Sequence, residues 1–359
     1  MNKNIMFHIG HDTNYEYRVK ATSGGLGTLL QRYLLSTNRY GTSITFQFNK
    51  EKCMYEPQMI YRKEDVNNCG SIYQDINLAN FVRKNIGNIK NGIVLTCPPC
   101  QVSVIRQMLD KASIPNFIIS FCCSGQMTIE GTWKYYELLG INKEDVENMQ
   151  YRGNGWPSGI QILLKNGERI YKDNWTEPWV TLHSAGFYRP KRCYYCKLDT
   201  SYKSDISLAD PWLDKYLNED TIGNTLFIVN TSLGQDILNA ISEKGLFEYV
   251  DTDYNSYYTA QKPNVEKANR ILNQEKYLKR VIRLIENPRI RAYFTKDVQR
   301  MRLFIRLRQR IQDTSSIANI KKLNMRIVCK IINKCRYLWL SRKIGSHDGF
   351  FTVQGGNRL

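Results

Sequence analysis

The chain has 359 residues, of which 42 % are hydrophobic and 23 % are charged, a balance that is typical of globular proteins and excludes a disordered or fibrous one. No stretch approaches the ~20 consecutive apolar residues that span a bilayer, and the first residues lack an export signal, so we expect a cytoplasmic protein with reduced cysteines. The formal net charge is +18, but twenty Lys or Arg and three acids lie between positions 276 and 343, so a near-neutral body precedes a basic tail.

The N-terminal region has the alternating pattern of an α/β fold. Residues 5–9 are strand-like and lead to a glycine-rich turn at 23–27. Beyond the turn, the apolar residues of 29–34 fall on one face of a helix, and 44–48 alternates as a strand does. We therefore expect the turn to lead directly into a helix.

Two short apolar runs, 93–95 and 117–121, are suited to buried strands. The segment 102–109 between them has helical periodicity. This order of strand, helix and strand predicts a parallel pair joined by a crossover helix.

After residue 149 the pattern changes. Asn166-Gly167 lies between two apolar stretches and predicts a β-hairpin over 160–171, and a strand is expected at 225–230. From Pro263 to about residue 340 the pattern is helical, with a break at Pro288 and a loop at 313–316.

Cysteines in three segments are candidate metal ligands: Cys97 and Cys100, Cys122 and Cys123, and Cys193 and Cys196. A C-x2-C pair lets two thiolates bind one centre from a tight turn, and the three segments together supply enough thiolates for a 4Fe-4S cluster or a structural zinc. The alternative for the first four is packing in the core, because free cysteine is among the most buried residue types.

Three further segments contain candidate binding groups. The glycine-rich turn could hold a phosphate at a helix start, but it matches neither the dinucleotide nor the P-loop pattern, so a plain strand-to-helix connection stays open. Arg152 could pair with an anion, and Asp210 with a ribose or ribityl hydroxyl beside Trp212. Ordinary core positions are the alternative for these two segments, and no catalytic triad is evident.

In this order the segments resemble the beta-subunit family of coenzyme F420 hydrogenases and dehydrogenases, which bind FAD and iron–sulfur clusters. The resemblance covers about residues 5–270 and rests on the order of seven short motifs, each weak by itself. The motifs lie at 18–25, 70–73, 99–101, 123–125, 151–157, 193–212 and 223–234.

The resemblance implies both a ligand set and a flavin site. The implied cluster ligands are Cys100, Cys123, Cys193 and Cys196, with Cys122 as a neighbour that could substitute. The implied FAD-binding residues are Arg18, Thr22, Ser23, Gly24 and Gly25, with Ser71, Tyr73, Arg152 and Asp210 on the walls. The expected fold is an α/β (α+β) body with a mixed sheet, a Cys-rich iron–sulfur loop and a basic helical tail. Its expected regions are 1–149, which binds flavin; 150–270, which is β-rich and completes the site; and 271–359, the tail.

The implied function is that of an oxidoreductase in which a 4Fe-4S cluster passes electrons to FAD and on to a substrate. The chain starts at the flavin region without the N-terminal ferredoxin module of many members, so we expect an external donor, either a ferredoxin-like protein or a reduced deazaflavin. Members of the bacterial branch are often encoded with surface-polysaccharide genes, which suggests a glycan precursor as substrate. The competing hypothesis is a non-catalytic electron-transfer or scaffold subunit at the membrane surface.

The tail contains an amphipathic helical pattern with basic residues around it. Its apolar positions are Ile320, Leu323, Ile327, Ile331 and Leu338. Such a helix can lie on an anionic membrane, which would place the protein peripherally on the inner face. A solvated helix packed on the body is the alternative, and nucleic-acid binding is the least favoured option.

Overall fold

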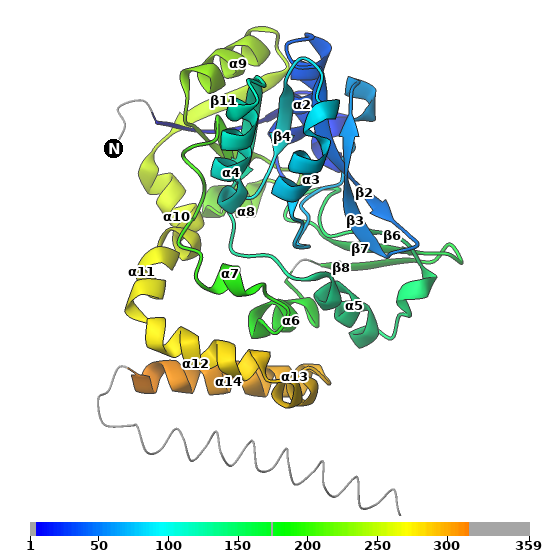
Figure 1. Ribbon diagram of the computed structural model, residues 1–359, viewed down its shortest axis with the longest axis vertical. Coiled ribbons are helices and arrows are strands. Elements are labelled where there is room, and N and C mark those ends of the chain that lie inside the picture. Colours follow the sequence, from blue (N-terminus) through cyan, green and yellow to red (C-terminus); the bar gives the residue numbers. More distant parts are fainter. Residues whose placement is uncertain (1–4, 174, 316–359) are drawn as a thin grey trace, which may run out of the picture. The chain divides into compact units, whose positions relative to one another are not determined.

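The computed structural model describes residues 5–173 and 175–315 (Figure 1). The chain divides into two compact units, Met1–Glu275 and Lys276–Leu359. Within the described residues, no helix is both long enough and apolar enough to cross a membrane.

The first unit is built on a mixed sheet of eight strands in the order β11-β1-β10-β9-β5-β4-β2-β3. Strands β2, β4, β5 and β9 run parallel, and the other neighbours pair antiparallel. The strands are β1 (Met6–Asp12), β2 (Thr42–Asn49), β3 (Met54–Ile60), β4 (Ile93–Thr96), β5 (Asn116–Phe121), β9 (Ile206–Ala209), β10 (Thr225–Val229) and β11 (Phe247–Thr252). The predicted mixed α/β fold is confirmed, as is the parallel β4–β5 pair with helix α4 (Pro99–Lys111) between its strands.

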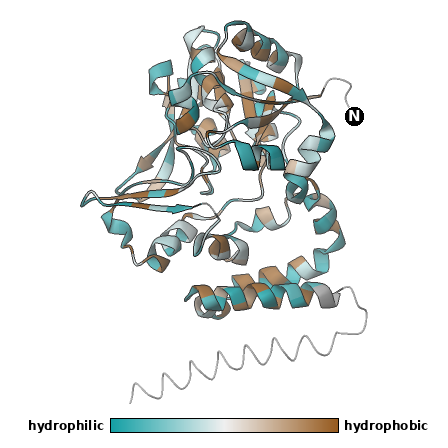
Figure 2. Ribbon diagram, turned by 180° about the vertical axis from the view of Figure 1, so that it is seen from behind, coloured by the Kyte–Doolittle hydropathy of each residue, from teal (hydrophilic) through white to brown (hydrophobic). Residues whose placement is uncertain are grey.

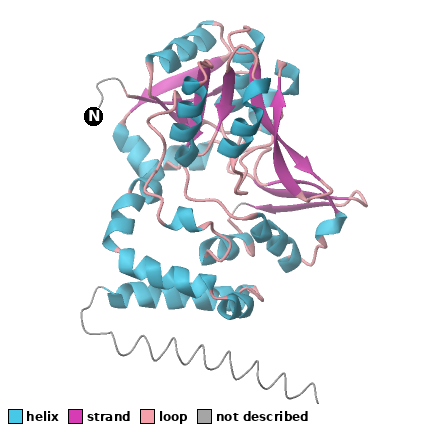
Figure 3. Ribbon diagram, in the orientation of Figure 1, coloured by secondary structure: helices cyan, strands magenta, loops and turns pink. Residues whose placement is uncertain are grey.

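Helices cover both faces of this sheet (Figure 3). Side chains alternate along each strand, so Phe117 and Ile119 pack with α2 (Leu26–Ser36) and α9 (Ser232–Glu243). Ile118 points to the opposite face and packs with α3 (Leu78–Asn85) and α4, while α10 (Tyr254–Val265) covers β1 and β10 on their own part of the sheet. Figure 2 shows hydrophobic residues along several strands, whereas the helices carry both hydrophobic and hydrophilic residues.

A second sheet has three antiparallel strands, β6 (Val146–Gln150), β7 (Gly159–Leu164) and β8 (Arg169–Asp173). Strands β7 and β8 form the predicted hairpin around Asn166-Gly167. The remaining helices of this unit are α1 (Tyr15–Lys20), α5 (Ile129–Leu138), α6 (Trp179–Ala185), α7 (Lys191–Tyr194), α8 (Asp214–Glu219) and α11 (Lys267–Asn273), with short 3-10 turns at Lys63–Asp65, Ile86–Asn88 and Lys143–Asp145. Because β9, β10 and β11 complete the sheet that β1 to β5 begin, residues on either side of position 149 share one core.

The second unit contains α13 (Pro288–Phe294), α14 (Val298–Ser315) and nearly all of α12 (Glu275–Glu286). The predicted break at Pro288 is confirmed: Asn287 Oδ1 accepts hydrogen bonds from the N–H groups of Arg289 and Ile290 and so begins α13. The prediction of a loop at 313–316 is wrong for residues 313–315, which belong to α14 (Val298–Ser315). No Gly or Pro interrupts the helical sequence at these positions. The amphipathic pattern at 320–338 lies outside the described residues.

Candidate functional site

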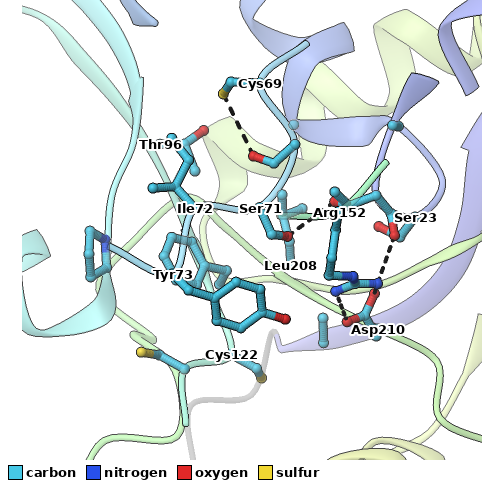
Figure 4. A pocket seen from close by; sticks show the side chains of 18 of the residues that line it. Ser23, Cys69, Ser71, Ile72, Tyr73, Thr96, Cys122, Arg152, Leu208 and Asp210 are labelled. Carbon is cyan, nitrogen blue, oxygen red and sulfur yellow. Dashed lines mark hydrogen bonds and ion pairs between the residues drawn. The ribbon is translucent and has the colours of Figure 1, made fainter. Parts of the chain in front are cut away.

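A cavity of about 340 Å³ lies at the carboxyl ends of the parallel strands in the first unit (Figure 4). Thr96 ends β4, Phe121 ends β5, and Asp210 directly follows β9; all three line the cavity. The carboxyl edge of parallel strands is where open α/β sheets bind ligands. The topology therefore places this cavity where a ligand site is expected.

One wall of the cavity is the N-terminus of α2. Gly25 precedes the helix with a φ of 83°, which a residue with a side chain rarely adopts, and the first helical hydrogen bond runs from Leu29 N–H to Gly25 O at 3.0 Å. The N–H groups of the first turn thus have no partner within the helix, and Gly25, Gly27 and Thr28 line the cavity. This wall has the positive end of a helix dipole and favours an anion.

A buried ion pair lies on a neighbouring part of the wall. Arg152 donates to both carboxylate oxygens of Asp210, at 2.7 and 3.1 Å, and to the carbonyl oxygen of Thr22 at 2.8 Å. Burial by itself lowers the pKa of Arg152, but the Asp210 carboxylate reverses this and raises that pKa, so the guanidinium is charged. The Nε of Arg152 is buried without a hydrogen-bond partner among the described residues. Arg152 itself lines the cavity, so a buried positive charge lies in the cavity wall.

Aromatic and hydroxyl side chains complete this wall. Ser71 Oγ lies 3.2 Å from Thr22 Oγ1. The ring of Tyr73 makes edge contacts with Tyr151 and Trp179, with ring centroids 5.7 Å apart in both cases. Figure 4 shows the Tyr73 hydroxyl pointing toward the pair of Arg152 and Asp210. Packing thus fixes a polar group beside the ion pair.

The structure separates the residues predicted to bind FAD into two groups. Those that line the cavity are Thr22, Ser23, Gly25, Ser71, Tyr73, Arg152 and Asp210. Gly24 and Arg18 are not among the lining residues. The N–H of Gly24 donates to Thr225 Oγ1 at 2.9 Å, and a Cβ at this position would lie 2.3 Å from Gly10 O. Arg18 Nε donates to Gly223 O at 2.7 Å. Both therefore have packing roles in this structure.

The four predicted cluster ligands come within electrostatic range of one another. Desolvation raises the pKa of the Cys100 thiol, and the nearby Cys196 and Cys193 thiols add to this increase. Burial raises the pKa of the Cys123 thiol to about 11, with Cys193 and Cys100 again adding to it. The fold thus brings together three segments that span residues 100 to 196 of the sequence.

The other cysteines differ in their surroundings. Cys97 is fully buried in the core with α3 and α4, as the core-packing alternative expects. Cys122 lines the cavity, and its Sγ lies 3.2 Å from Tyr257 Oη. Within residues 5–173 and 175–315, no three Cys, His, Asp or Glu side chains are grouped so that they could hold a metal ion.

Several cavity residues were not predicted as site residues. The first turn of α2 directly follows Gly24 and Gly25, which the sequence analysis identified. The residues of this turn could therefore have been predicted as site residues from their place in the sequence. Trp175, Gln126 and Gln261 also line the cavity. Gln126 and Trp175 lie in two separate connections and Gln261 lies in α10, and no local sequence pattern marks any of the three as a cavity residue.

Comparisons with known proteins agree with this architecture. Residues 90–254 match the family that is described as the C terminus of the coenzyme F420 hydrogenase/dehydrogenase beta subunit. A chain of the F420-reducing NiFe hydrogenase complex from Methanosarcina barkeri, studied as a xenon derivative, superposes with a TM-score of 0.57 at 16 % identity, over 75 % of this chain and 91 % of that one. At this identity the likeness shows the fold alone. A comparison with curated proteins found no match.

Proposed function

We propose a redox function from the premise that this chain belongs to the coenzyme F420 hydrogenase/dehydrogenase beta subunit family, whose C-terminal region it matches over residues 90–254. The protein is an oxidoreductase that holds FAD in the cavity and a 4Fe-4S cluster on the thiolates of Cys100, Cys123, Cys193 and Cys196. An external donor supplies the electrons. FAD, when bound, links one-electron to two-electron transfer, and the protein positions it and tunes its surroundings.

The observation that carries the flavin proposal is the pairing of two anion-binding features on one cavity. The first N–H groups of α2 have no partner within the helix, and the positively charged side chain of Arg152 lines the same cavity. Arg152 also donates a hydrogen bond to the carbonyl oxygen of Thr22, three residues before Gly25, so the two features are close in space although they are far apart in the sequence. A pyrophosphate needs this combination of backbone donors and a fixed positive charge.

The cavity also suits the planar ring of a flavin. Tyr73 and Trp212 both line it. The Trp212 ring packs against Trp156 with centroids 5.1 Å apart, and it faces the Arg152 guanidinium at 5.9 Å. Two aromatic side chains held by their neighbours offer apolar faces to a ring without large loss of side-chain entropy.

The donor set suits a cubane cluster better than a single zinc ion. A zinc ion draws all its ligands toward one point. A 4Fe-4S cluster binds each thiolate at a separate corner, which suits four thiols that come from three segments and influence one another's pKa. Cys123 belongs to both the thiol group and the cavity wall, which supports direct transfer between cluster and flavin.

A second pocket supports a hydroxyl-rich substrate, as expected for a glycan precursor in surface polysaccharide biosynthesis. Asn67 and Asn68 line both this pocket and the cavity. Gln150 and Asn154 add further carboxamides to the second pocket. Carboxamides donate and accept hydrogen bonds, as paired recognition of hydroxyl groups requires.

The basic tail supports attachment to an anionic membrane surface. Within the described part, residues 276–312 contain twelve Lys or Arg and two acids. Tyr277, Val281, Phe294 and Phe304 are buried, so these apolar side chains are not available for insertion into lipid. Charge attraction, at ~1 kcal/mol per basic residue near the surface, therefore carries the attachment of this part.

Cofactor content of anaerobically purified protein tests the two main assignments separately. We expect about four iron atoms and one flavin per chain. Cys196→Ser should lose most iron and keep its fold, because one corner of the cluster is unbound. Gly25→Val should lose FAD and keep iron, because a β-branched residue is strained at a φ of 83° and blocks approach to the helix start.

Cys53→Ala is the matched control, since Cys53 is a buried cysteine outside the predicted ligand set. It should retain both cofactors. A colourless protein with one stoichiometric zinc would overturn the cluster assignment. Full FAD occupancy in Gly25→Val would place the flavin elsewhere.

A further inference from the structure

The segment that carries Cys193 and Cys196 is unusually basic for this part of the protein. Between positions 189 and 203 there are five Lys or Arg and one acid, although the chain outside 276–343 has a net charge of only about +1. Lys197 and Lys203 are exposed, and no ion pair involves either of them within the described residues. The positive charge of these two lysines is therefore available to a partner.

Acidic groups nearby are already engaged. Asp75 pairs with Arg192. Asp199 Oδ2 accepts hydrogen bonds from Tyr257 Oη at 2.9 Å and from Tyr202 Oη at 3.4 Å. Neither carboxylate pairs with Lys197 or Lys203, so the local positive potential is not cancelled within the segment.

Large apolar side chains alternate with these lysines. Tyr195 is 36 % exposed, Leu198 is 41 % exposed and Tyr202 is 42 % exposed. Tyr195 lies between the two cysteines of the C-x2-C pair. Exposed aromatic residues among basic ones are typical of protein–protein interfaces, where tyrosine supplies contact area at low entropic cost.

We propose that residues 191–203 are the docking surface for an acidic electron-donor protein. This inference rests on the proposed function, because it takes the thiolates of Cys193 and Cys196 to hold an electron acceptor. In each encounter the donor's reduced centre loses one electron and the thiolate-bound centre gains it, with no bond made or broken.

A protein donor fits this surface better than a small molecule does. Residues 191–203 line neither the cavity nor the second pocket, whereas a small donor would need a cavity. Transient redox partners use small interfaces below about 1,200 Å², and complementary charge raises their association rate. A negatively charged protein face would meet Lys197 and Lys203 while covering Tyr195.

The test uses Lys197→Glu/Lys203→Glu in the cofactor-loaded protein. The probe is a small acidic ferredoxin, chemically reduced, and stopped-flow absorbance follows reduction of the bound flavin. At low salt we expect the second-order rate constant to fall at least about tenfold. The difference should shrink at high salt, because exposed charges are screened.

The matched control is Lys84→Glu/Lys111→Glu, which makes the same charge change at exposed positions near the C-terminal ends of α3 and α4. Dithionite, a small reductant, should reduce the wild type and both variants at equal rates. If it does not reduce the wild-type flavin, the proposed function fails, irrespective of docking.

Two results would overturn the docking surface while leaving the proposed function intact. One is that dithionite reduces the flavin but the acidic ferredoxin does not. The other is that the ferredoxin reduces Lys197→Glu/Lys203→Glu as fast as it reduces the wild type at low salt. Iron content and dithionite reduction establish that each variant is folded and loaded.

Discussion

The ion pair of Arg152 and Asp210 gives a quantitative prediction about stability. Arg152 has 4 % of its side chain exposed and Asp210 has 18 %. Asp210→Ala removes both carboxylate bonds and the bond from Trp156 Nε1 at 3.3 Å, so the buried guanidinium loses its negative partner and is left with the neutral groups Thr22 O and Tyr73. Loss of one partner of a buried pair costs about 3–5 kcal/mol, so we expect Asp210→Ala to lower the free energy of unfolding by that amount.

A second variant distinguishes an uncompensated charge from a general loss of packing. Arg152→Met/Asp210→Ala removes the charge along with its partner. Because replacing a buried pair by apolar groups is often close to neutral, this double variant should be more stable than Asp210→Ala alone. The two substitutions are therefore expected to be strongly non-additive.

Guanidinium denaturation followed by tryptophan fluorescence measures both variants. Trp156 and Trp212 lie next to the ion pair, so the signal reports on this part of the fold. A loss below about 1 kcal/mol for Asp210→Ala would match a solvent-exposed pair and refute the reasoning. Additive losses in the double variant would also refute it, since they would mean that Arg152 is not left uncompensated.

Three further predictions use other parts of the chain. Burial lowers the pKa of His183 to about 3, so below pH ~6.5 the unfolded state binds a proton that the folded state does not. The free energy of unfolding should therefore fall by up to ~1.4 kcal/mol for each pH unit below that value. Denaturation curves at pH 7 and 5 should show a smaller loss of stability for His183→Phe than for the wild type. Gly24→Ala should destabilise the protein by about 2 kcal/mol or more, because its Cβ would lie 2.3 Å from Gly10 O, whereas Gly87→Ala, with nothing within 4 Å, should be tolerated in thermal melts. Truncation after Asn273 should abolish sedimentation with anionic vesicles, and sedimentation of the full chain should fall at high salt; binding retained by the truncated protein would contradict the role of the tail.

Local patterns predicted the elements whose partners are near in sequence. The periodicities at 93–95, 102–109 and 117–121 correspond to β4, α4 and β5, and Asn166-Gly167 corresponds to the hairpin of β7 and β8. In each case the connection is short, so the sequence itself limits the possible pairings. Such elements need no information from distant residues.

Pairings over long distances could not be predicted in this way. Strand β1 lies between β10 and β11, and Gly10 pairs with Thr225 and Tyr249. Alternation shows which face of a strand is buried, but it does not identify the neighbour. The cavity depends on these pairings, since its walls extend from Ala21 to Asn264.

The glycine pair shows the same limit at a single site. From the sequence alone, Gly24 and Gly25 are predicted to belong to one turn with a common role. In the structure Gly24 is needed because β1 and β10 leave no room for a Cβ, while Gly25 is needed for its φ of 83° and borders the cavity. Adjacent glycines thus meet different requirements, which only the tertiary arrangement distinguishes.

At the carboxyl end of β5, the two adjacent cysteines between which the sequence could not choose have different surroundings. Cys122 Sγ lies 3.2 Å from Tyr257 Oη, and burial is the main cause that raises the pKa of its thiol. Cys123 is instead close to Cys193 and Cys100, and its backbone is fixed from both sides: its N–H donates to Asp199 O at 2.9 Å, and its carbonyl accepts from Lys267 Nζ at 2.6 Å. A cluster requires thiolates at fixed positions, and bonds to the 196–199 loop and to α11 supply that rigidity. These surroundings support the proposal that Cys123 is the fourth ligand, while Cys122 lines the cavity next to Tyr257.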